Sequence, residues 1–471
     1  MTIDTPPRPP SLARPPAAPV PSAAPAGRRR GLLRPGWPLS ALIVLFPLWW
    51  ALGLMELIFP LLAVPMAVQL FRRRPLRLPP GFVLWALFLL WVLAGAVLLG
   101  VNPPRTLPAA ASTRLIAYAV RLIEYLSMTV VLLYVGNLKE HELPRRRLIG
   151  MLGWFFLVAT LGGLLGTFWP AFEFTGPIEL LLPAGIRSNI YVQSLVHPQA
   201  AQVQDLLGYS SPRPKAPFDY TNSWGNNMVI LGVWFVAGWW ASGRPVRRLA
   251  MVLVLCVAAV PLVYSLNRGV WIGIGFAAGY VALRVAIRGR PFVLVGTAAA
   301  LALCAAVVLQ SPLGQLVQGR LENPQSNSIR ASLNEQSVQL ALASPVLGYG
   351  GTRNALGSPQ SITVGRTSSC ARCGNFAIGS TGQLWQLLVS TGFVGAALYF
   401  GFFLVVLWRY RHDRTVIGIA GSLVVVVMLL FALFYNVLAS PLFVLMVSVG
   451  LLWRNDQARA AEAVSAPGRA G

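Results

Sequence analysis

Long, uninterrupted runs of apolar residues constrain this chain more than any other feature. Several runs, for example 148–168, 291–310 and 415–434, carry few or no charges, and a helix needs only about 20 such residues to cross the roughly 30 Å of hydrocarbon in a bilayer. The strands of a membrane β-barrel would instead alternate polar and apolar residues. Because 56% of the 471 residues are hydrophobic and only 11% are charged, the composition also excludes a soluble enzyme and a largely disordered chain. The sequence therefore predicts an all-α integral membrane protein.

The apolar runs predict twelve transmembrane helices. The run 37–71 is too long for one crossing, and Gly53 and Glu56 interrupt it near its middle, so we divide it into two short helices. The other predicted spans are 81–101, 115–136, 148–168, 225–242, 249–266, 269–287, 291–310, 383–408, 415–434 and 437–453. Residues 1–36 are rich in proline and arginine and predict a disordered tail, while 454–471 predict a second tail behind a membrane domain at 37–453.

Positive charge is concentrated in every second connection between the predicted spans. These connections and the final exit contain Arg72, Arg73, Arg74, Arg77, Lys139, Arg145, Arg146, Arg147, Arg244, Arg247, Arg248, Arg284, Arg288, Arg290, Arg409, Arg411, Arg414 and Arg454. Cytoplasmic connections of membrane proteins collect positive charge. The pattern predicts that both termini are cytoplasmic and that two long connections, 169–224 and 311–382, are external. The net charge of +24 then reflects topology, so membrane lipids are expected partners and nucleic acid is not.

The external connections carry more arginine than acidic residues. The arginines are Arg105, Arg187, Arg213, Arg268, Arg320, Arg330, Arg353, Arg366 and Arg372; the acidic residues are Glu173, Glu179, Asp205, Asp219, Glu322 and Glu335. A guanidinium binds phosphate oxygens through two parallel hydrogen bonds, so a group of arginines suits a lipid-linked phosphate, whereas single ones are typical of any surface. Arg268 differs because it lies in a very short turn between two apolar spans, where a charge held at the membrane boundary indicates function.

Two other pairs of residues are of chemical interest. Arg121 and Glu124 share a helix face inside the predicted span 115–136, which is consistent with a structural ion pair or with a substrate-binding role. Cys370 and Cys373 form a CxxC motif that an external loop would allow to close as a local disulfide. A structural zinc site needs four ligands, and no second pair or nearby histidine exists. We therefore expect no metal ion and no other cofactor.

Four short segments follow one another in a characteristic order. They are Arg213 to Asn222, Ser265 to Arg268, Arg330 followed by Pro345 to Gly350, and the segment from Thr381 to Gly392 that leads into the next span. Together they resemble the O-antigen ligase and O-antigen polymerase superfamily of bacterial envelope glycan enzymes, over roughly residues 210–410. Two positions depart from that family: Pro217 stands where a glycine is common, and Thr381-Gly382 stands where the family carries a His-Asn pair.

The resemblance implies a membrane glycosyltransferase with two long external loops that needs no metal ion. It would transfer a glycan from an undecaprenyl-pyrophosphate carrier to a hydroxyl of a lipid core, another lipid-linked glycan or a cell-wall polymer, at the outer face of the cytoplasmic membrane of a bacterium. Other glycan assembly proteins are possible partners. The resemblance further implies that Arg213, Arg268, Arg330 and Asn222 bind the substrate and that Arg268 also takes part in catalysis.

The missing histidine leaves the catalytic base to another residue. Thr381 cannot act as a base at neutral pH, which makes a lipid A core ligase a less favoured reading than a polymerase or a ligase with another acceptor. The replacement candidates in the outer loops are Glu335, Glu322, Asp219 and His197. We expect Glu335 to be the base, because it lies roughly one helical turn from Arg330 if that stretch is helical.

Two alternatives from other classes remain open at the level of sequence. A transporter or flippase of envelope precursors would also have about a dozen spans, although such proteins usually show internal repeats and broken helices at the membrane midplane. A non-catalytic scaffold for glycan assembly would also explain the missing histidine. Transfer activity on a lipid-linked oligosaccharide distinguishes these possibilities.

Overall fold

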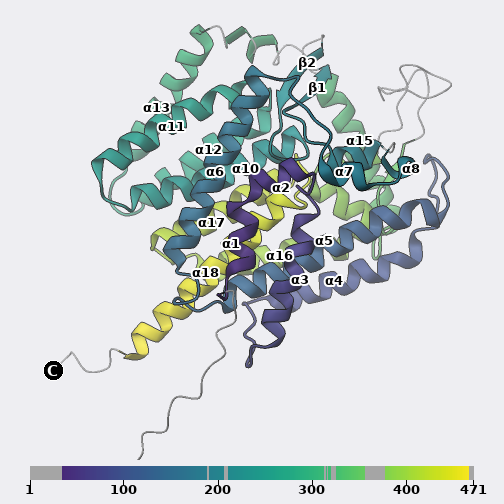
Figure 1. Cartoon of the computed structure of the whole chain (residues 1–471), viewed down its shortest axis with the longest axis horizontal. Helices are drawn as coiled ribbons and strands as arrows, with labels where there is room; N and C mark the ends of the chain where they lie inside the picture. Colours follow the sequence, from purple (N-terminus) through teal and green to yellow (C-terminus); the bar gives the residue numbers. More distant parts are fainter. Residues whose placement is uncertain are drawn as a thin grey trace, which may run out of the picture. The chain divides into compact units, whose positions relative to one another are not determined.

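The computed structural model describes residues 34–187, 190–205, 210–311, 314–315, 317–319, 325–355 and 377–465, and these residues are mostly helical (Figure 1). The helices before the first long connection are α1 (Trp37–Val44), α2 (Phe46–Leu52), α3 (Ile58–Phe71), α4 (Phe82–Ala94) with the 3-10 turn η1 (Gly95–Leu98), α5 (Ala111–Asn137) and α6 (Arg145–Phe168). The remaining helices are α7 (Pro177–Leu181), α8 (Ala184–Arg187), α9 (Ile190–Val196), α10 (Thr221–Trp240), α11 (Pro245–Tyr264), α12 (Arg268–Ala286), α13 (Phe292–Gln310), α15 (Gln325–Ala343), α16 (Gln383–Tyr410), α17 (Val416–Phe431) and α18 (Ser440–Ser465). Two small antiparallel pairs of strands join β1 (Ala201–Asp205) to β2 (Ser210–Pro214) and β3 (Arg353–Asn354) to β4 (Ala377–Ile378).

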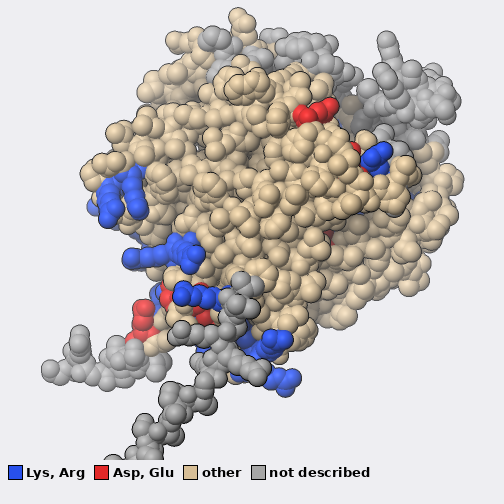
Figure 2. All heavy atoms as spheres, in the orientation of Figure 1, with Lys and Arg blue, Asp and Glu red and all other residues tan. Residues whose placement is uncertain are grey.

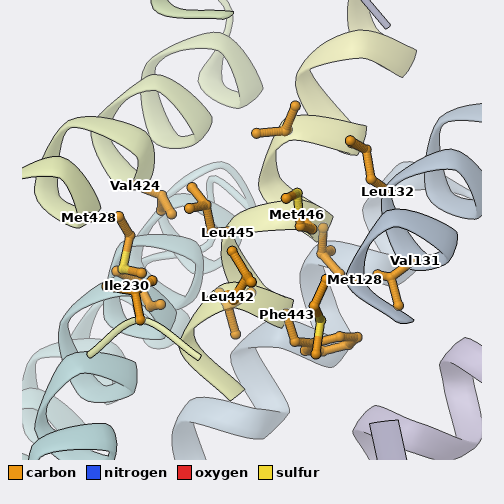
Figure 3. Packing of buried hydrophobic residues seen from close by; sticks show 14 of the residues in the cluster. Met128, Val131, Leu132, Ile230, Val424, Met428, Leu442, Phe443, Leu445 and Met446 are labelled. Carbon is orange, nitrogen blue, oxygen red and sulfur yellow. The ribbon is translucent and has the colours of Figure 1, made fainter. Parts of the chain in front are cut away.

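The hydrophobic core is built around α18. Its first four turns are buried on every side, as expected of a helix that is apolar all round and lies inside a bundle. Figure 3 shows Phe443 and Met446 of α18 against Met128 of α5, and Leu445 beside Met428 of α17. Ile230 of α10 belongs to the same cluster. This packing fixes α5, α10, α17 and α18 relative to one another and so positions their ends.

The prediction of twelve spans is wrong for the part of the chain that the structure describes. Each predicted span overlaps a helix, but six helices are both long and apolar enough to cross a membrane: α5, α6, α11, α12, α13 and α16. Three further apolar helices, α3, α4 with η1, and α17, are shorter than a full crossing. Helices α10 and α18 are long enough but carry polar or charged residues over several turns. Apart from the divided run 37–71, the sequence prediction counted each apolar run as one crossing and did not allow for short helices or polar helix ends.

Two predicted boundaries also differ from the structure. The run 37–71 forms three helices and not two, because the chain leaves the helical path at Leu45 just before Pro47, as well as at Gly53, whose φ is 79°. The predicted tail at 454–471 begins too early, since α18 continues as a helix to Ser465. The predicted disordered tail 1–36 lies almost wholly outside the described residues, as do Cys370 and Cys373 with their predicted local disulfide.

The basic connections lie together at one end of the membrane domain. In the view of Figure 2, most Lys and Arg side chains gather at the lower left, and the rest of this face is almost free of charge. Hydrogen bonds join the connections across the chain: Arg145 Nη1 to Asn455 Oδ1 at 2.9 Å, Arg284 Nη2 to the Asp413 carbonyl at 2.9 Å, and Arg454 Nη2 to the Leu143 carbonyl at 2.8 Å. The contacts include the charged half of α18, which explains why that helix stays regular. We call this the basic end.

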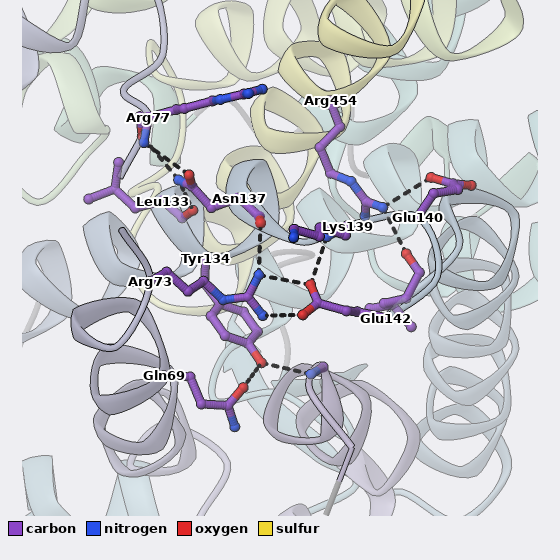
Figure 4. Close-up of polar contacts among 12 residues, drawn as sticks. Gln69, Arg73, Arg77, Leu133, Tyr134, Asn137, Lys139, Glu140, Glu142 and Arg454 are labelled. Atoms are coloured by element: carbon purple, nitrogen blue, oxygen red, sulfur yellow. Dashed lines mark hydrogen bonds and ion pairs between the residues drawn. The ribbon is translucent and has the colours of Figure 1, made fainter. Parts of the chain in front are cut away.

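The best-formed ion pair of the basic end links the α3–α4 and α5–α6 connections. The Arg73 guanidinium donates to both carboxylate oxygens of Glu142, at 2.8 and 2.9 Å, and also to the Asn137 carbonyl at 2.9 Å (Figure 4). Burial alone would raise the pKa of Glu142, but hydrogen bonds from Arg73 and from the Lys139 amide, with the Arg73 charge, lower it overall. The pair therefore stabilises the folded state when Glu142 is ionised.

The lowered pKa of Glu142 predicts how the basic end responds to acid. Its contribution to the free energy of unfolding is complete above the usual pKa of glutamate and is lost as the pH falls through the lowered value. We expect Arg73→Gln to cost about 2 kcal/mol at neutral pH and less in acid. Arg72→Gln, at an exposed neighbouring residue, is the matched control. Thermal unfolding of the detergent-solubilised protein measures both variants, and equal losses in the two would contradict the assignment.

Candidate functional site

Three helices begin at a common polar region away from the basic end. Helix α10 begins at Thr221, α12 at Arg268 and α16 at Gln383. Thr221 and Gln383 are fully buried, and Asn267, the residue before α12, is 5% exposed. Burying this many polar groups is unfavourable unless they bond to one another or to a ligand. This polar region is the candidate functional site.

A β-hairpin carries Arg213 into this region. Strands β1 and β2 pair so that Gln202 lies opposite Arg213, and Arg213 is only 5% exposed. Its Nε donates to the Ser265 carbonyl at 2.5 Å, in the turn between α11 and α12. The Thr221 hydroxyl donates a hydrogen bond to the Arg213 carbonyl at 3.5 Å. These contacts bring the first two motif segments together.

The turn between α11 and α12 presents both its backbone and its side chains to the site. Leu266 has a φ of 52°, a left-handed conformation that is rare for leucine and is typical of strained turns at functional sites. Asn267 Nδ2 donates to Asn222 Oδ1 at 3.3 Å, and the Tyr435 hydroxyl donates to Asn267 Oδ1. Arg268 follows as the first residue of α12 and is half-buried.

Helix α15 supplies the third predicted arginine. Arg330 Nη1 donates to the Phe434 carbonyl at 3.3 Å. Burial lowers the pKa of Arg330, and the charge of Arg268 lowers it further, while Tyr435 opposes the shift. Arg330 therefore lies within electrostatic range of both Arg268 and Tyr435.

The charges of two of these arginines act on Tyr435. Burial raises the pKa of its hydroxyl to about 12, and the charges of Arg330 and Arg213 act in the opposite direction. The charge of Arg268, the third arginine, acts on Arg330. Hydrogen bonds join Arg213 to Ser265, Arg330 to Phe434, and Tyr435 to Asn267, the residue before Arg268, so the three arginines come from distant parts of the sequence to one region of the fold. We call the three arginines and Tyr435 the arginine cluster.

The ends of the three helices add to the positive potential of the arginine cluster. The Gln383 amide, the first of α16, donates to the Tyr435 carbonyl at 2.9 Å, and Asn222 in the first turn of α10 bonds to Asn267 before α12. A helix N-terminus carries about half a positive charge and unsatisfied amide groups that bind anions. The Gln383 and Leu384 amides are already bonded to the carbonyls of Tyr435 and Ala432, so these helix N-termini favour an anion through their partial positive charge and not through free amides.

Glu335 does not face the arginine cluster. Helix α15 confirms that the stretch is helical, but residues five apart on a helix are separated by about 140° around its axis. Glu335 is exposed, and its carboxylate accepts a hydrogen bond from Gln339 Nε2 at 3.3 Å. The structure thus separates the predicted base from Arg330.

The other predicted base positions differ in their surroundings. Thr381 donates to Asn334 Oδ1 at 2.5 Å, so the position of the family's histidine lies against α15. His197 Nδ1 is 2.6 Å from the nearly buried Glu179 carboxylate, within the long connection that precedes β1. Glu322 lies outside the described residues. Asp219 lies between β2 and α10, in the segment that follows Arg213.

The glycines of the third and fourth motif segments serve the packing of α16. Helix α16 is interrupted at Gly392, where φ is 65° and ψ is −170°. The loop 345–350 bonds to this interruption: the Tyr349 and Gly350 amides donate to the carbonyls of Val389 and Ser390, each at 2.8 Å. This contact holds the end of α15 against α16 and so positions Arg330.

Sequence reasoning missed Tyr435, Gln383 and Asn267. Tyr435 follows α17 and Gln383 begins α16, so both lie where apolar runs are interrupted by polar groups. The signal that could have revealed them is the group of polar residues that interrupts each apolar run. The sequence analysis used these interruptions only to set helix boundaries. Within the ranges that the structure describes, no three His, Cys, Asp or Glu residues are grouped so that they could hold a metal ion.

Comparison with known proteins adds no relative from which a role could be carried over. No family model matches this chain, and no curated protein matches it either.

Proposed function

We propose that this protein transfers a glycan from a polyprenyl-pyrophosphate carrier to an acceptor hydroxyl at the outer face of the cytoplasmic membrane of a bacterium. The observation that supports this most is the arginine cluster, in which hydrogen bonds bring Arg213 and Tyr435 to the two ends of the turn before α12, and Arg330 to Phe434. The order of the motif segments that supply these arginines supports the same reaction.

The chemistry of the leaving group fits the arginine cluster. When the glycan is transferred, the bond from its anomeric carbon to the pyrophosphate breaks, and the pyrophosphate oxygen takes the electron pair. Guanidinium forks bind phosphate oxygens in pairs, and the partial positive charge of the helix N-termini adds to their potential. Fixed positive groups that stabilise charge as it develops are usually the largest single contribution to catalysis. We expect Arg268, the first residue of α12, to take this role.

The position of the site favours an enzyme over a transporter. Transporter sites usually lie at the midplane, between discontinuous helices that belong to repeats. Here the arginine cluster lies where α10, α12 and α16 begin, and the basic connections lie where α12 and α16 end. A site at one boundary of the membrane domain suits a substrate whose lipid lies in one leaflet and whose glycan lies in water.

The proposal places the basic end in the cytoplasm and α15 outside. In a variant with all native cysteines replaced, we expect a membrane-impermeant thiol reagent to label Glu335→Cys in intact cells. Arg72→Cys should be labelled only after the cells are opened, because positive charge is retained in the cytoplasm. Both residues are exposed, so accessibility in the fold is matched. Labelling of Arg72→Cys in intact cells would invert the topology.

Reconstitution tests the function itself. The purified protein in liposomes, supplied with an undecaprenyl-pyrophosphate oligosaccharide and a hydroxyl-bearing glycan acceptor, should release the lipid pyrophosphate and extend the acceptor. A flippase would move the lipid-linked glycan between leaflets without changing it, and a scaffold would do neither. Either of these results would overturn the proposal.

A further inference from the structure

A groove lies along an exposed face of α16 close to the end of that helix. It is lined by Leu404, Val405, Leu407, Trp408 and Arg411 and has a volume of about 530 Å³, which is within the range of sites that hold small molecules. Leu404 is 56% exposed and Trp408 is 69% exposed. Leu404, Trp408 and Arg411 follow one another at helical spacing, so the groove runs lengthwise along one face of the helix. We call it the Trp408 groove.

The Trp408 groove is apolar along its length and cationic at one end. Four of its five residues are apolar, and the fifth, Arg411, directly follows α16. Helix α16 is long and apolar enough to cross a membrane. Exposed apolar side chains on such a helix face hydrocarbon, whereas an arginine at its end reaches the headgroups. The groove therefore changes from apolar to charged in the same order as a phospholipid does from acyl chain to headgroup.

Arg411 is held in place by Trp408. Its guanidinium carbon lies 3.9 Å from the centre of the Trp408 ring, and its Nη1 donates to the Trp408 carbonyl at 2.5 Å. Tryptophan is enriched where the membrane meets water, and its ring attracts a cation electrostatically. Arg411 is exposed. A stacked guanidinium can still bind phosphate oxygens with its edge, through parallel hydrogen bonds.

Further arginines lie at the cationic end of the groove. Arg284 donates from Nη1 to the Arg411 carbonyl at 2.8 Å and from Nη2 to the Asp413 carbonyl at 2.9 Å. Arg288 Nη2 donates to the Arg414 carbonyl at 3.2 Å. These bonds join the end of α12 to the α16–α17 connection, on which the Arg411 and Arg414 side chains are exposed. Clusters of about four Lys or Arg residues at the end of a membrane helix are typical of binding sites for anionic lipids.

Two acidic residues in this part of the basic end already have other partners. Asp413 is 5% exposed, and its carboxylate pairs with Arg459 at 3.2 Å and accepts from Asn455 Nδ2 at 2.9 Å. Asp456 pairs with Arg409 at 3.1 Å. The arginines at the groove therefore keep their positive charge, and an anion complements it.

We propose that the Trp408 groove binds an anionic phospholipid of the leaflet at the basic end. One acyl chain lies along Leu404, Leu407 and Trp408, and the headgroup phosphate accepts hydrogen bonds from the Arg411 guanidinium. A zwitterionic phospholipid has the same acyl chains but no net charge, so the arginines favour the anionic headgroup. Helix α16 begins at Gln383 beside the arginine cluster, so this lipid and the proposed donor bind at opposite ends of the same helix.

The first test compares two lipids with identical acyl chains. In native mass spectrometry of the detergent-solubilised protein, we expect tighter binding of phosphatidylglycerol than of phosphatidylcholine. Arg411→Gln should lower the affinity for phosphatidylglycerol about tenfold and leave that for phosphatidylcholine unchanged. The preference should weaken at high ionic strength, because the arginine is exposed. Phosphatidylglycerol that binds Arg411→Gln as tightly as wild type would overturn the proposal.

A second arginine stacked on tryptophan provides the matched control. The Arg248 guanidinium carbon lies 4.8 Å from the centre of the Trp240 ring, and both side chains are exposed. Arg248 is also at the basic end but does not line the Trp408 groove. We expect Arg248→Gln to bind phosphatidylglycerol as wild type does. An equal loss in Arg248→Gln and Arg411→Gln would show that only total charge matters and would overturn the site.

The acyl chain is tested with a headgroup that lacks one. Phosphatidylglycerol should raise the unfolding temperature of the wild-type protein, because a ligand that binds only the folded state stabilises it. Glycerol 3-phosphate at the same concentration should not, since it cannot fill the apolar part of the groove. A rise as large as that with phosphatidylglycerol would show that a free phosphate is sufficient and would overturn the lipid assignment.

The unfolding temperature also distinguishes lipid binding from a structural role. Trp408→Ala removes an exposed wall of the groove and the partner on which Arg411 stacks, so it should abolish the extra stabilisation by phosphatidylglycerol. In phosphatidylcholine, Trp408→Ala and Arg411→Gln should unfold at the same temperature as wild type. A loss of stability in phosphatidylcholine equal to that in phosphatidylglycerol would assign both residues to the fold and overturn the proposal.

Discussion

Replacing Arg268 by lysine should lower the rate of glycan transfer about a hundredfold, which corresponds to a loss of roughly 3 kcal/mol of transition-state stabilisation. Lysine keeps the positive charge but offers a single point of contact in place of a planar fork with two parallel donors. Arg268 begins α12, so its backbone is held by the helix and cannot move to correct the different geometry of a lysine. We expect the defect mainly in kcat, because the pyrophosphate gains charge as the bond to the glycan breaks.

The control for this variant is at the other end of the membrane domain. Arg290, just beyond the end of α12, is exposed at the basic end, and Arg290→Lys should leave the rate unchanged. Both variants keep the net charge of the chain, so a general effect of charge on membrane insertion is excluded. Full activity of Arg268→Lys in the reconstituted assay would show that the fork is not used.

Replacing Gly348 by alanine should destabilise the folded protein by more than about 3 kcal/mol, through a strained backbone and a steric overlap. Gly348 has a φ of 62°, and a Cβ atom there would lie 2.6 Å from the backbone nitrogens of Thr391 and Gly392. These are backbone atoms of α16 at its interruption, so they cannot move aside as a flexible side chain would. Because the same contact positions α15, the arginine cluster would be lost together with the packing.

A matched glycine on α12 separates this effect from a general intolerance of alanine. Gly279 lies inside α12, and a Cβ atom there would have no atom within 4 Å. Gly279→Ala should therefore be neutral or stabilise the helix by up to about 1 kcal/mol. The unfolding temperature in detergent and the yield of monodisperse protein measure both variants. Equal stability of Gly348→Ala and Gly279→Ala would contradict the packing described for the loop 345–350.

The sequence predicted the location of helices better than their surroundings. Helices α13 and α18 are both strongly apolar in their membrane part, yet α18 is central, whereas α13 has no buried residue. Composition cannot distinguish them, because lipid and a protein core are equally apolar solvents for a side chain. The count of spans failed for a related reason: α10 is buried in the bundle although polar residues occupy its first two turns.

The sequence could predict the site residues that belong to motifs. It could not predict residues that only the fold brings into the site. Arg213, Arg268 and Arg330 are widely separated in sequence, but each lies at a motif position, and the hydrogen bonds of Arg213, Arg330 and Tyr435 bring these segments to one region. The expectation that Glu335 is the base considered its distance from Arg330 along the helix without the rotation around the axis, and in the structure Glu335 is exposed.

The most direct test of the central claim is a structure of the protein in a lipid nanodisc with undecaprenyl pyrophosphate bound. We predict that the two phosphate groups lie within hydrogen-bonding distance of the Arg213, Arg268 and Arg330 guanidinium groups, where α10, α12 and α16 begin. A pyrophosphate bound at the basic end, or one that touches none of these arginines, would contradict the account.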